Sequence, residues 1–205
     1  MMEQTTPYTE KFYLDQKDGS LHSAKEIVPL ILNDVKPKSV VDVGCGLGTF
    51  LSVFREYGVQ DILGIDGDYV EKKMLLIPQE KFQPMDVSKP FYLNRAFDLA
   101  VSLEVAEHIS QDAAVSFVDS LTKLAPVILF SAAIPFQGGT NHVNEQWPEY
   151  WAELFHQKGF VPIDGIRPRI WKNDRVAFWY AQNILVFAIG LAVFFGSCHQ
   201  AELFG

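Results

Sequence analysis

The sequence predicts an α/β protein with an open, doubly wound and mostly parallel sheet. Short apolar runs rich in β-branched residues alternate with helical segments along most of the chain, the pattern of repeated strand–helix–strand units. The clearest unit begins at the apolar run Ser39–Val43, passes through a glycine-rich turn into a helix, and ends at Asp66. A nearly continuous apolar run of this length is typical of a buried parallel strand.

The same alternation continues to the end of the chain, and it places each expected element in turn. Segments of four to nine residues that are apolar and bounded by turn residues are expected as strands, and longer amphipathic segments as helices. We expect strands at residues 39–43, 62–66, 81–86, 96–102, 127–132, 160–166 and 180–188, and helices at residues 24–33, 49–57, 69–76, 112–124 and 147–157.

A chain of 205 residues suits one domain with a full hydrophobic core. Residues 1–20 are expected to form a loosely structured N-terminal arm, and residues 21–188 the folded core. Residues 189–205 form an apolar tail that matches no motif, so an interface in a homo-oligomer, a membrane contact and an atypical terminus all stay open. The apolar run at residues 184–196 is too short for a simple spanning helix, and we expect no membrane span.

Charge and cysteine content narrow the classes of partner and compartment. The net charge is −8, from 17 basic and 25 acidic residues, and no basic stripe is visible, which argues against a nucleic-acid partner. The two cysteines, Cys45 and Cys198, do not make a disulfide framework, and the polar N-terminus lacks the apolar region of a signal peptide. We therefore expect a cytoplasmic protein.

The glycine-rich turn after the first strand indicates a nucleotide-type cofactor. Its spacing is Gly44-x-Gly46-x-Gly48, and glycines permit a positive φ and a close approach of ligand to backbone. Ligands of doubly wound sheets bind at the carboxyl ends of the strands, where this turn lies. The dinucleotide fingerprint requires a third glycine where this chain has Thr49, so the turn disfavours a pyrophosphate ligand such as NAD.

Two acids at the ends of the next two strands extend the candidate site. Asp66 ends the second strand, where a carboxylate can accept hydrogen bonds from both hydroxyls of a ribose. Asp86 ends the third, where a carboxylate can accept from the amino group of adenine. For each acid, the alternative is a solvated loop residue.

In order, the segments VVDVGCGLGTF, GIDGDYV, PMDVS and FDLAVSLEVAEHI resemble the motif series of the class I S-adenosylmethionine-dependent methyltransferases, and the resemblance covers about residues 20–188. It implies a Rossmann-like sheet of seven strands in the order 3-2-1-4-5-7-6, the last antiparallel, with helices on both faces. It also implies S-adenosylmethionine as the cofactor, with the glycine turn under its methionine part and Asp66 at its ribose. The residues that the resemblance assigns to the cofactor are Asp42, Gly44, Cys45, Gly46, Gly48, Asp66, Gly67, Asp86, Val87, Ser102 and Leu103.

Two histidines are candidates for the catalytic base that a hydroxyl acceptor needs. His108 follows the fourth strand in the segment Glu104–His108, and the resemblance supports a histidine there. His142 lies in a polar loop after the fifth strand. Each has a structural alternative, because either ring can simply satisfy backbone groups of its loop. His142 and Glu145 alone are too little to predict a metal, and we expect none.

The sequence therefore favours methyl transfer to an oxygen or nitrogen of a small molecule such as a sugar. The alternatives are a nicotinamide-dependent oxidoreductase, a binding module that has lost its acceptor site, and a methyltransferase of proteins or nucleic acids. Ser102-Leu103-Glu104-Val105 stands where the Asn-Pro-Pro-Tyr type of sequence would mark methylation of bases or glutamine.

Overall fold

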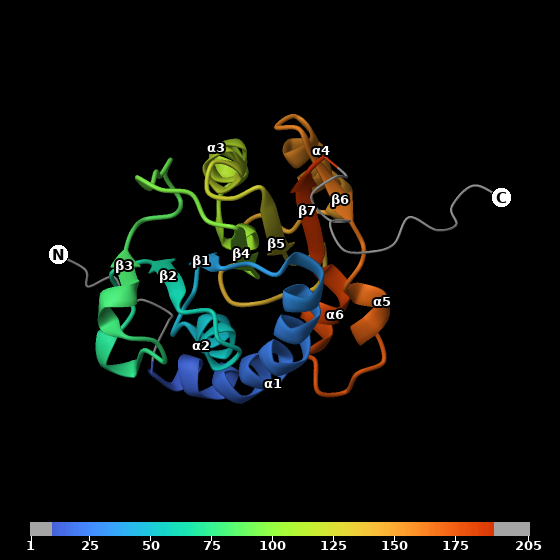
Figure 1. Cartoon of the computed structure of the whole chain (residues 1–205). Helices are drawn as coiled ribbons and strands as arrows, with labels where there is room; N and C mark the ends of the chain where they lie inside the picture. The colour runs from blue at the N-terminus through green and yellow to red at the C-terminus, as the bar shows by residue number, and fades with distance from the viewer. Residues whose placement is uncertain (1–9, 191–205) are drawn as a thin grey trace.

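In the computed structural model, which describes residues 10–190, the chain folds around one sheet in the order β3-β2-β1-β4-β5-β7-β6 (Figure 1). The order confirms the predicted doubly wound, Rossmann-like fold. Its strands are β1 (Ser39–Val43), β2 (Asp61–Asp66), β3 (Phe82–Pro84), β4 (Leu99–Leu103), β5 (Val127–Ser131), β6 (Phe160–Ile163) and β7 (Leu185–Ile189).

One strand of this sheet, β7, runs opposite to the others. The pairs β3–β2, β2–β1, β1–β4 and β4–β5 are parallel, whereas β7 runs antiparallel to both β5 and β6. All five residues of β1, β4 and β5 are buried, as expected of strands covered on both faces.

Helices cover both faces of the sheet and divide the core into two clusters (Figure 1). One face carries α1, α2, α5 and α6, and the other carries α3 and α4. Each longer helix turns an apolar stripe inward, as α2 does with Phe50, Leu51, Val53 and Phe54. The helices are α1 (Glu10–Val35), α2 (Thr49–Glu56), α3 (Gln111–Thr122), α4 (Pro148–His156), α5 (Arg167–Ile170) and α6 (Phe178–Asn183).

Register brings the carboxyl ends of the central strands to one edge. Val43 lies opposite Ile65 between β1 and β2, and Asp42 lies opposite Val101 between β1 and β4. The loops that follow β1, β2 and β4 therefore leave the sheet side by side, which is where ligands of this fold class bind.

The expected N-terminal arm is wrong in its second half, because α1 begins at Glu10 rather than at residue 24. Pro29 lies well inside this helix. The serines at positions 20 and 23 have the chemistry of an N-cap, which favours a later start. However, the Ser23 hydroxyl donates to the Gly19 carbonyl oxygen at 2.7 Å, which is a bond inside the helix. The first nine residues and the tail from residue 191 onward, including Cys198, lie outside the described residues.

Two further elements differ from expectation because tertiary contacts decide them. The helix expected at residues 69–76 is reduced to one 3₁₀ turn, Lys72–Met74. The Leu76 amide donates to the Leu47 carbonyl oxygen at 2.9 Å, and Pro78 disfavours a helical Ile77. Likewise, residues 180–183, expected as strand, complete α6, and β7 begins only at Leu185.

Other expected elements are found with boundaries shifted by up to three residues, and β6 ends at Ile163 instead of residue 166. Among the described residues, no helix is long and apolar enough to cross a membrane.

Candidate active site at the carboxyl edge of the sheet

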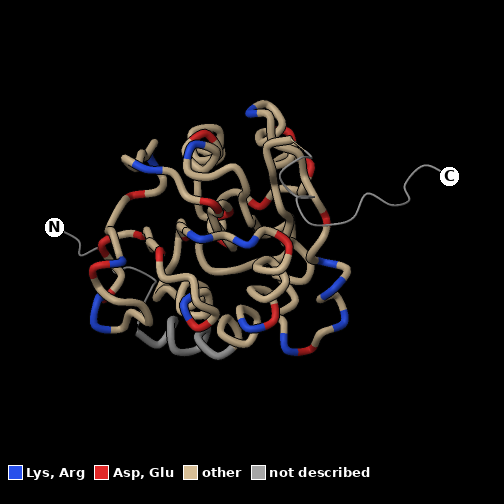
Figure 2. Tube along the Cα trace, in the orientation of Figure 1, with Lys and Arg blue, Asp and Glu red and all other residues tan. Residues whose placement is uncertain are grey.

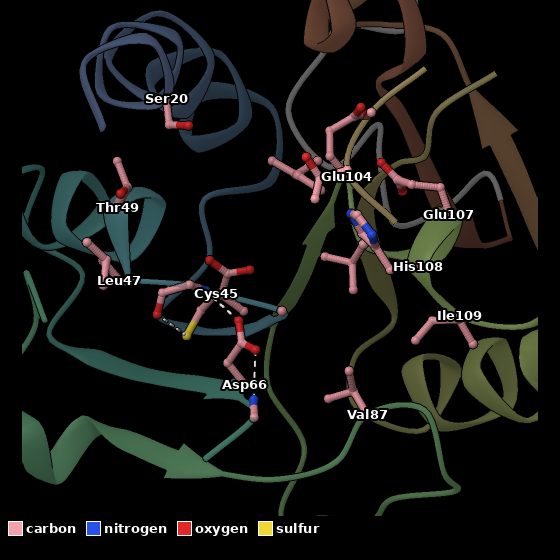
Figure 3. A pocket seen from close by; sticks show the side chains of 18 of the residues that line it. Ser20, Cys45, Leu47, Thr49, Asp66, Val87, Glu104, Glu107, His108 and Ile109 are labelled. Carbon is pink, nitrogen blue, oxygen red and sulfur yellow. Dashed lines mark hydrogen bonds between the residues drawn. The ribbon is translucent and has the colours of Figure 1, made fainter. Parts of the chain in front are cut away.

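A cavity of about 1120 Å³ opens at the carboxyl ends of β1, β2 and β4 (Figure 3). Its wall combines the glycine turn after β1, the segment after β2, the end of β3, the segment after β4 and the loop after β5. Ser20 of α1 and Phe178–Tyr180 of α6 complete it. Its volume slightly exceeds that of ordinary small-molecule sites, so it has room for a cofactor and an acceptor together.

The glycine turn is fixed to the end of β2 by backbone hydrogen bonds. The amides of Gly44 and Cys45 both donate to the Ile65 carbonyl oxygen, at 2.8 and 3.1 Å. Gly44 adopts φ +80°, and a Cβ there would lie 2.3 Å from a side-chain carbon of Val105. Glycine is therefore required at this position by both conformation and space.

Asp66 joins the turn to the segment after β2. Its Oδ2 accepts from the Gly46 amide at 2.7 Å, and its Oδ1 accepts from the Gly67 amide at 2.7 Å. The Tyr69 hydroxyl also donates to Oδ1, at 2.5 Å. Burial raises the pKa of Asp66 and these three donors lower it, so they support the ionised form against burial.

Asp42 adds a second buried carboxyl group to the cavity wall. Burial, with a further contribution from the charge of Asp66, raises its pKa to about 8. The two acids are 5% exposed each. Burial opposes the ionisation of both acids, and a cationic ligand in this poorly hydrated wall would favour their ionised forms.

Glutamates and histidines meet at the opposite end of the cavity, where the loops after β4 and β5 face each other (Figure 3). The rings of His108 and His142 stand edge to face with centroids 4.9 Å apart. Glu107 lies against them, with Oε1 at 4.0 Å from His142 Nε2. The amides of Val143 and Asn144 donate to the Glu107 carbonyl oxygen and fasten the two loops together.

Each histidine is oriented through its Nδ1 atom. His142 Nδ1 lies 2.9 Å from Glu145 Oε1, and His108 Nδ1 lies 3.3 Å from the Asn141 carbonyl oxygen. Burial lowers the pKa of His108, and His142 lowers it further. Burial raises the pKa of Glu107 well above its usual range, and the Glu104 carboxylate adds to that rise.

A family model described as a methyltransferase domain matches residues 21–155, about two thirds of the chain. The chain belongs to this methyltransferase family. The predicted class, an S-adenosylmethionine-dependent methyltransferase, is thereby confirmed.

Solved structures show the same fold at low sequence identity. The sugar N-methyltransferase KedS8 from Streptoalloteichus sp. ATCC 53650 matches with a TM-score of 0.67 at 13% identity, over 92% of this chain and 98% of that one. The magnesium protoporphyrin IX methyltransferase of Synechocystis PCC 6803, solved with bound SAH, matches with a TM-score of 0.60 at 17% identity. The match covers 87% of this chain and 88% of that one. The methyltransferase domain of bacterial CtHen1 matches with a TM-score of 0.58 at 19% identity, over 82% of this chain and 98% of that one. No match to a curated protein sequence is found.

Most of the predicted cofactor residues of the methyltransferase lie together on the cavity wall. They are Asp42, Gly44, Cys45, Gly46, Asp66, Gly67, Asp86, Val87 and Leu103. Asp86 is exposed there, and its carboxylate already accepts from the amide and hydroxyl of Ser88 and pairs with Lys89 at 2.7 Å. An adenine amino group would have to share this carboxylate with Ser88 and Lys89.

Two predicted cofactor residues are not part of the lining of this cavity. Gly48 is the N-cap of α2 at φ +78°, and a Cβ there would lie 2.9 Å from Ile77, so its glycine serves local packing. Ser102 is fully buried within β4, and its side chain lies on the face of the sheet that packs against α3 and α4, because neighbouring strand residues alternate.

Sequence reasoning missed two residues that shape the site of the methyltransferase. Tyr69 was assigned to a helix that does not form, so its reach to Asp66 was not foreseen. Glu107 was considered only as a neighbour of His108. The signal that could have identified it is the presence of two glutamates and a histidine in the five residues after β4. Glu104 adopts φ +55° and receives bonds from Gln137 and Asn183, a strained and well-supported placement typical of functional residues.

Proposed function

We propose that this methyltransferase uses S-adenosylmethionine to methylate a hydroxyl group of a small organic molecule. The observation that carries the proposal is the continuous cavity, which has the glycine turn with Asp42 and Asp66 at one end and the His108–His142 pair at the other. A cofactor and an acceptor bound in one cavity are held in the contact that transfer requires.

The residues at the first end suit the cofactor. The buried Asp66 carboxylate favours a positively charged ligand, and such a ligand would also favour ionisation of the buried Asp42, which agrees with a sulfonium. Asp66 would hold the ribose through its carboxylate, and the segment Met85–Val87 would lie along the adenine. The bound cofactor supplies an activated methyl group, so the chain's own residues need to orient the acceptor and exclude water.

The other end suits a compact polar acceptor. The loop Gln137–Thr140 and the aromatic residues of α6 border it, and His108 and His142 face the place where a hydroxyl would meet the methyl group. We propose that both histidines act directly on this hydroxyl. The bound cofactor would supply the activated methyl group, and an imidazole of the pair would accept the proton that the hydroxyl loses when its oxygen is methylated.

Surface charge supports a small acceptor over a nucleic acid. Lys and Arg alternate with Asp and Glu around the molecule (Figure 2). In the most basic stretch, Arg167, Arg169 and Arg175 pair with Asp164, Asp34 and Glu26. We further propose that the protein works in the cytoplasm, which its two cysteines support because disulfide-poor chains suit reducing compartments.

Calorimetric titration with S-adenosylhomocysteine and with NAD tests the cofactor assignment. We expect S-adenosylhomocysteine to bind the wild-type protein, NAD not to bind, and Asp66→Ala to weaken the interaction about 10- to 100-fold through lost charge-assisted hydrogen bonds. Asp112→Ala, an exposed acid of α3, is the matched control and should bind like wild type. Binding of NAD without S-adenosylhomocysteine would overturn the proposal. Methyl transfer to candidate hydroxyl compounds then tests the acceptor class.

A further inference from the structure

Three side chains of metal-ligating type converge at the acceptor end of the cavity. Glu107, His108 and His142 each offer one ligand atom, and these three atoms lie within 4.8 Å of one another. All three residues line the cavity. We propose that they bind a divalent transition-metal ion.

Glu107 provides the strongest argument, because its carboxylate is buried and one of its oxygens lacks a hydrogen-bond donor among the described residues. The residue is 1% exposed, and within the described part of the chain its Oε2 atom has no hydrogen-bond partner. Its Oε1 lies 4.0 Å from His142 Nε2, too far for a hydrogen bond. A buried carboxylate in this state is unfavourable, and a cation between it and the imidazoles would compensate both the charge and the unpaired oxygen.

The surrounding residues orient the imidazoles as metal ligands are usually oriented. A ligating histidine commonly has its other ring nitrogen held by a carboxylate or a backbone carbonyl. Here Glu145 holds Nδ1 of His142 and the Asn141 carbonyl oxygen lies at Nδ1 of His108. The Nε2 atom of His142 is thereby directed toward Glu107. Glu145 is itself fixed, because it accepts from the amides of Phe136 and Gly138, both at 2.9 Å.

The donor set indicates the class of metal. Two imidazoles and one carboxylate favour zinc, manganese, cobalt or iron over magnesium or calcium, which prefer oxygen ligands alone. Metal–ligand bonds of about 2.0–2.2 Å would draw the three ligand atoms closer by about 1 Å, which rotation of Glu107 and the two rings can supply. Nearby negative charge from Glu104 adds to the attraction for a cation.

A metal here would change the chemical role of the histidines. Three protein ligands leave coordination positions for an acceptor, and a hydroxyl that contacts a divalent ion loses its proton more readily. His108 and His142 would then be ligands instead of bases. This catalytic consequence rests on the proposed function, whereas the binding of the metal does not.

The test is a titration of chelator-treated protein with Co²⁺ alone, followed by visible absorption and calorimetry. We expect one Co²⁺ per chain with the absorption bands of a nitrogen-ligated ion. Glu107→Gln, His108→Ala and His142→Ala should each weaken binding at least tenfold, and Glu145→Gln about tenfold through the lost orientation of His142. His156→Ala, an exposed histidine of α4, is the control and should bind like wild type.

Binding of S-adenosylhomocysteine to each variant separates this proposal from the first. A variant that keeps S-adenosylhomocysteine binding is folded, so loss of Co²⁺ in it supports the metal site, and Glu107→Gln tests the site with the least change in shape. Wild-type protein that does not take up Co²⁺, or folded variants that bind it as wild type does, would overturn the metal site while leaving the cofactor assignment intact. If the wild-type protein does not bind S-adenosylhomocysteine, that result would instead count against the proposed function.

Discussion

The Tyr69 hydroxyl donates a 2.5 Å hydrogen bond to Asp66 Oδ1, the oxygen that also accepts from the Gly67 amide. Tyr69 lies at the surface of the cavity and is 40% exposed. Its hydroxyl therefore occupies a place on the carboxylate that the proposed ribose would need. Binding of the cofactor is expected to replace the tyrosine hydroxyl by a ribose hydroxyl.

Tyr69→Phe is accordingly expected to tighten the binding of S-adenosylhomocysteine. In this variant the free protein lacks the hydrogen bond that competes with the ligand for the Asp66 carboxylate. Binding no longer has to break that bond, so the affinity for S-adenosylhomocysteine should rise about three- to tenfold. Calorimetry measures the change, with Tyr57→Phe, an exposed tyrosine directly after α2, as the control. Weaker binding in Tyr69→Phe would show that the hydroxyl contacts the cofactor itself.

The raised pKa of Asp42 predicts a decrease of stability with pH. In the folded protein this carboxyl has a pKa of about 8, against 3.8 when it is exposed in the unfolded chain. Between these values the folded form holds a proton that the unfolded form has lost. The free energy of unfolding should therefore fall as the pH rises from about 4 to about 8, by up to about 1.4 kcal/mol per pH unit from this group.

Urea unfolding between pH 5 and pH 8 measures this slope. Asp42→Asn, which cannot ionise, is expected to reduce the slope and to be more stable than wild type at pH 8. Asp112→Asn is exposed on α3 and should keep the wild-type slope. An equal slope in Asp42→Asn and wild type would contradict the assignment of the effect to Asp42.

Glu145 is expected to hold the loop between β5 and α4 in place. Its carboxylate accepts from the amides of Phe136 and Gly138 and contacts the ring of His142. Glu145→Ala should cost about 1–3 kcal/mol locally, because three polar groups lose their partner. Hydrogen exchange should speed up at residues 136–142 while the amides of β1 and β4 keep their rates. Glu149→Ala, outside this network on α4, serves as comparison.

The contact between Gly44 and Val105 makes a steric prediction. Gly44→Ala would require φ +80° in an alanine and would bring its Cβ to 2.3 Å from Val105, so we expect a loss of about 2–4 kcal/mol in stability. Adding Val105→Ala should restore the steric part, about 1–2 kcal/mol, and leave the conformational part. A double-mutant cycle measured by thermal unfolding checks this, and strict additivity would exclude the contact as the cause.

Local patterns were sufficient for much of the sheet. The β-branched run at Ser39–Val43, the turn Gly44–Gly48 and the apolar run at Val127–Ser131 each carry their structure in their own composition, and all appear as expected. The strand order came from the motif resemblance, since no local pattern states which strands pair. The helix expected at residues 69–76 does not form for the opposite reason, because the Leu76 amide bonds to the Leu47 carbonyl oxygen, a contact from outside the segment.

The sequence by itself determined the class of fold and the position of the glycine turn, because glycine spacing and apolar periodicity are properties of neighbouring residues. Only the tertiary structure decided which side chains share the cavity. It placed the Tyr69 hydroxyl on Asp66, left Gly48 and Ser102 outside the cavity lining, and brought Glu107 close to two histidines that lie 34 positions apart in the chain. These contacts depend on strand register and on the conformations of loops. Both join residues that are far apart in the sequence, so no local pattern predicts them.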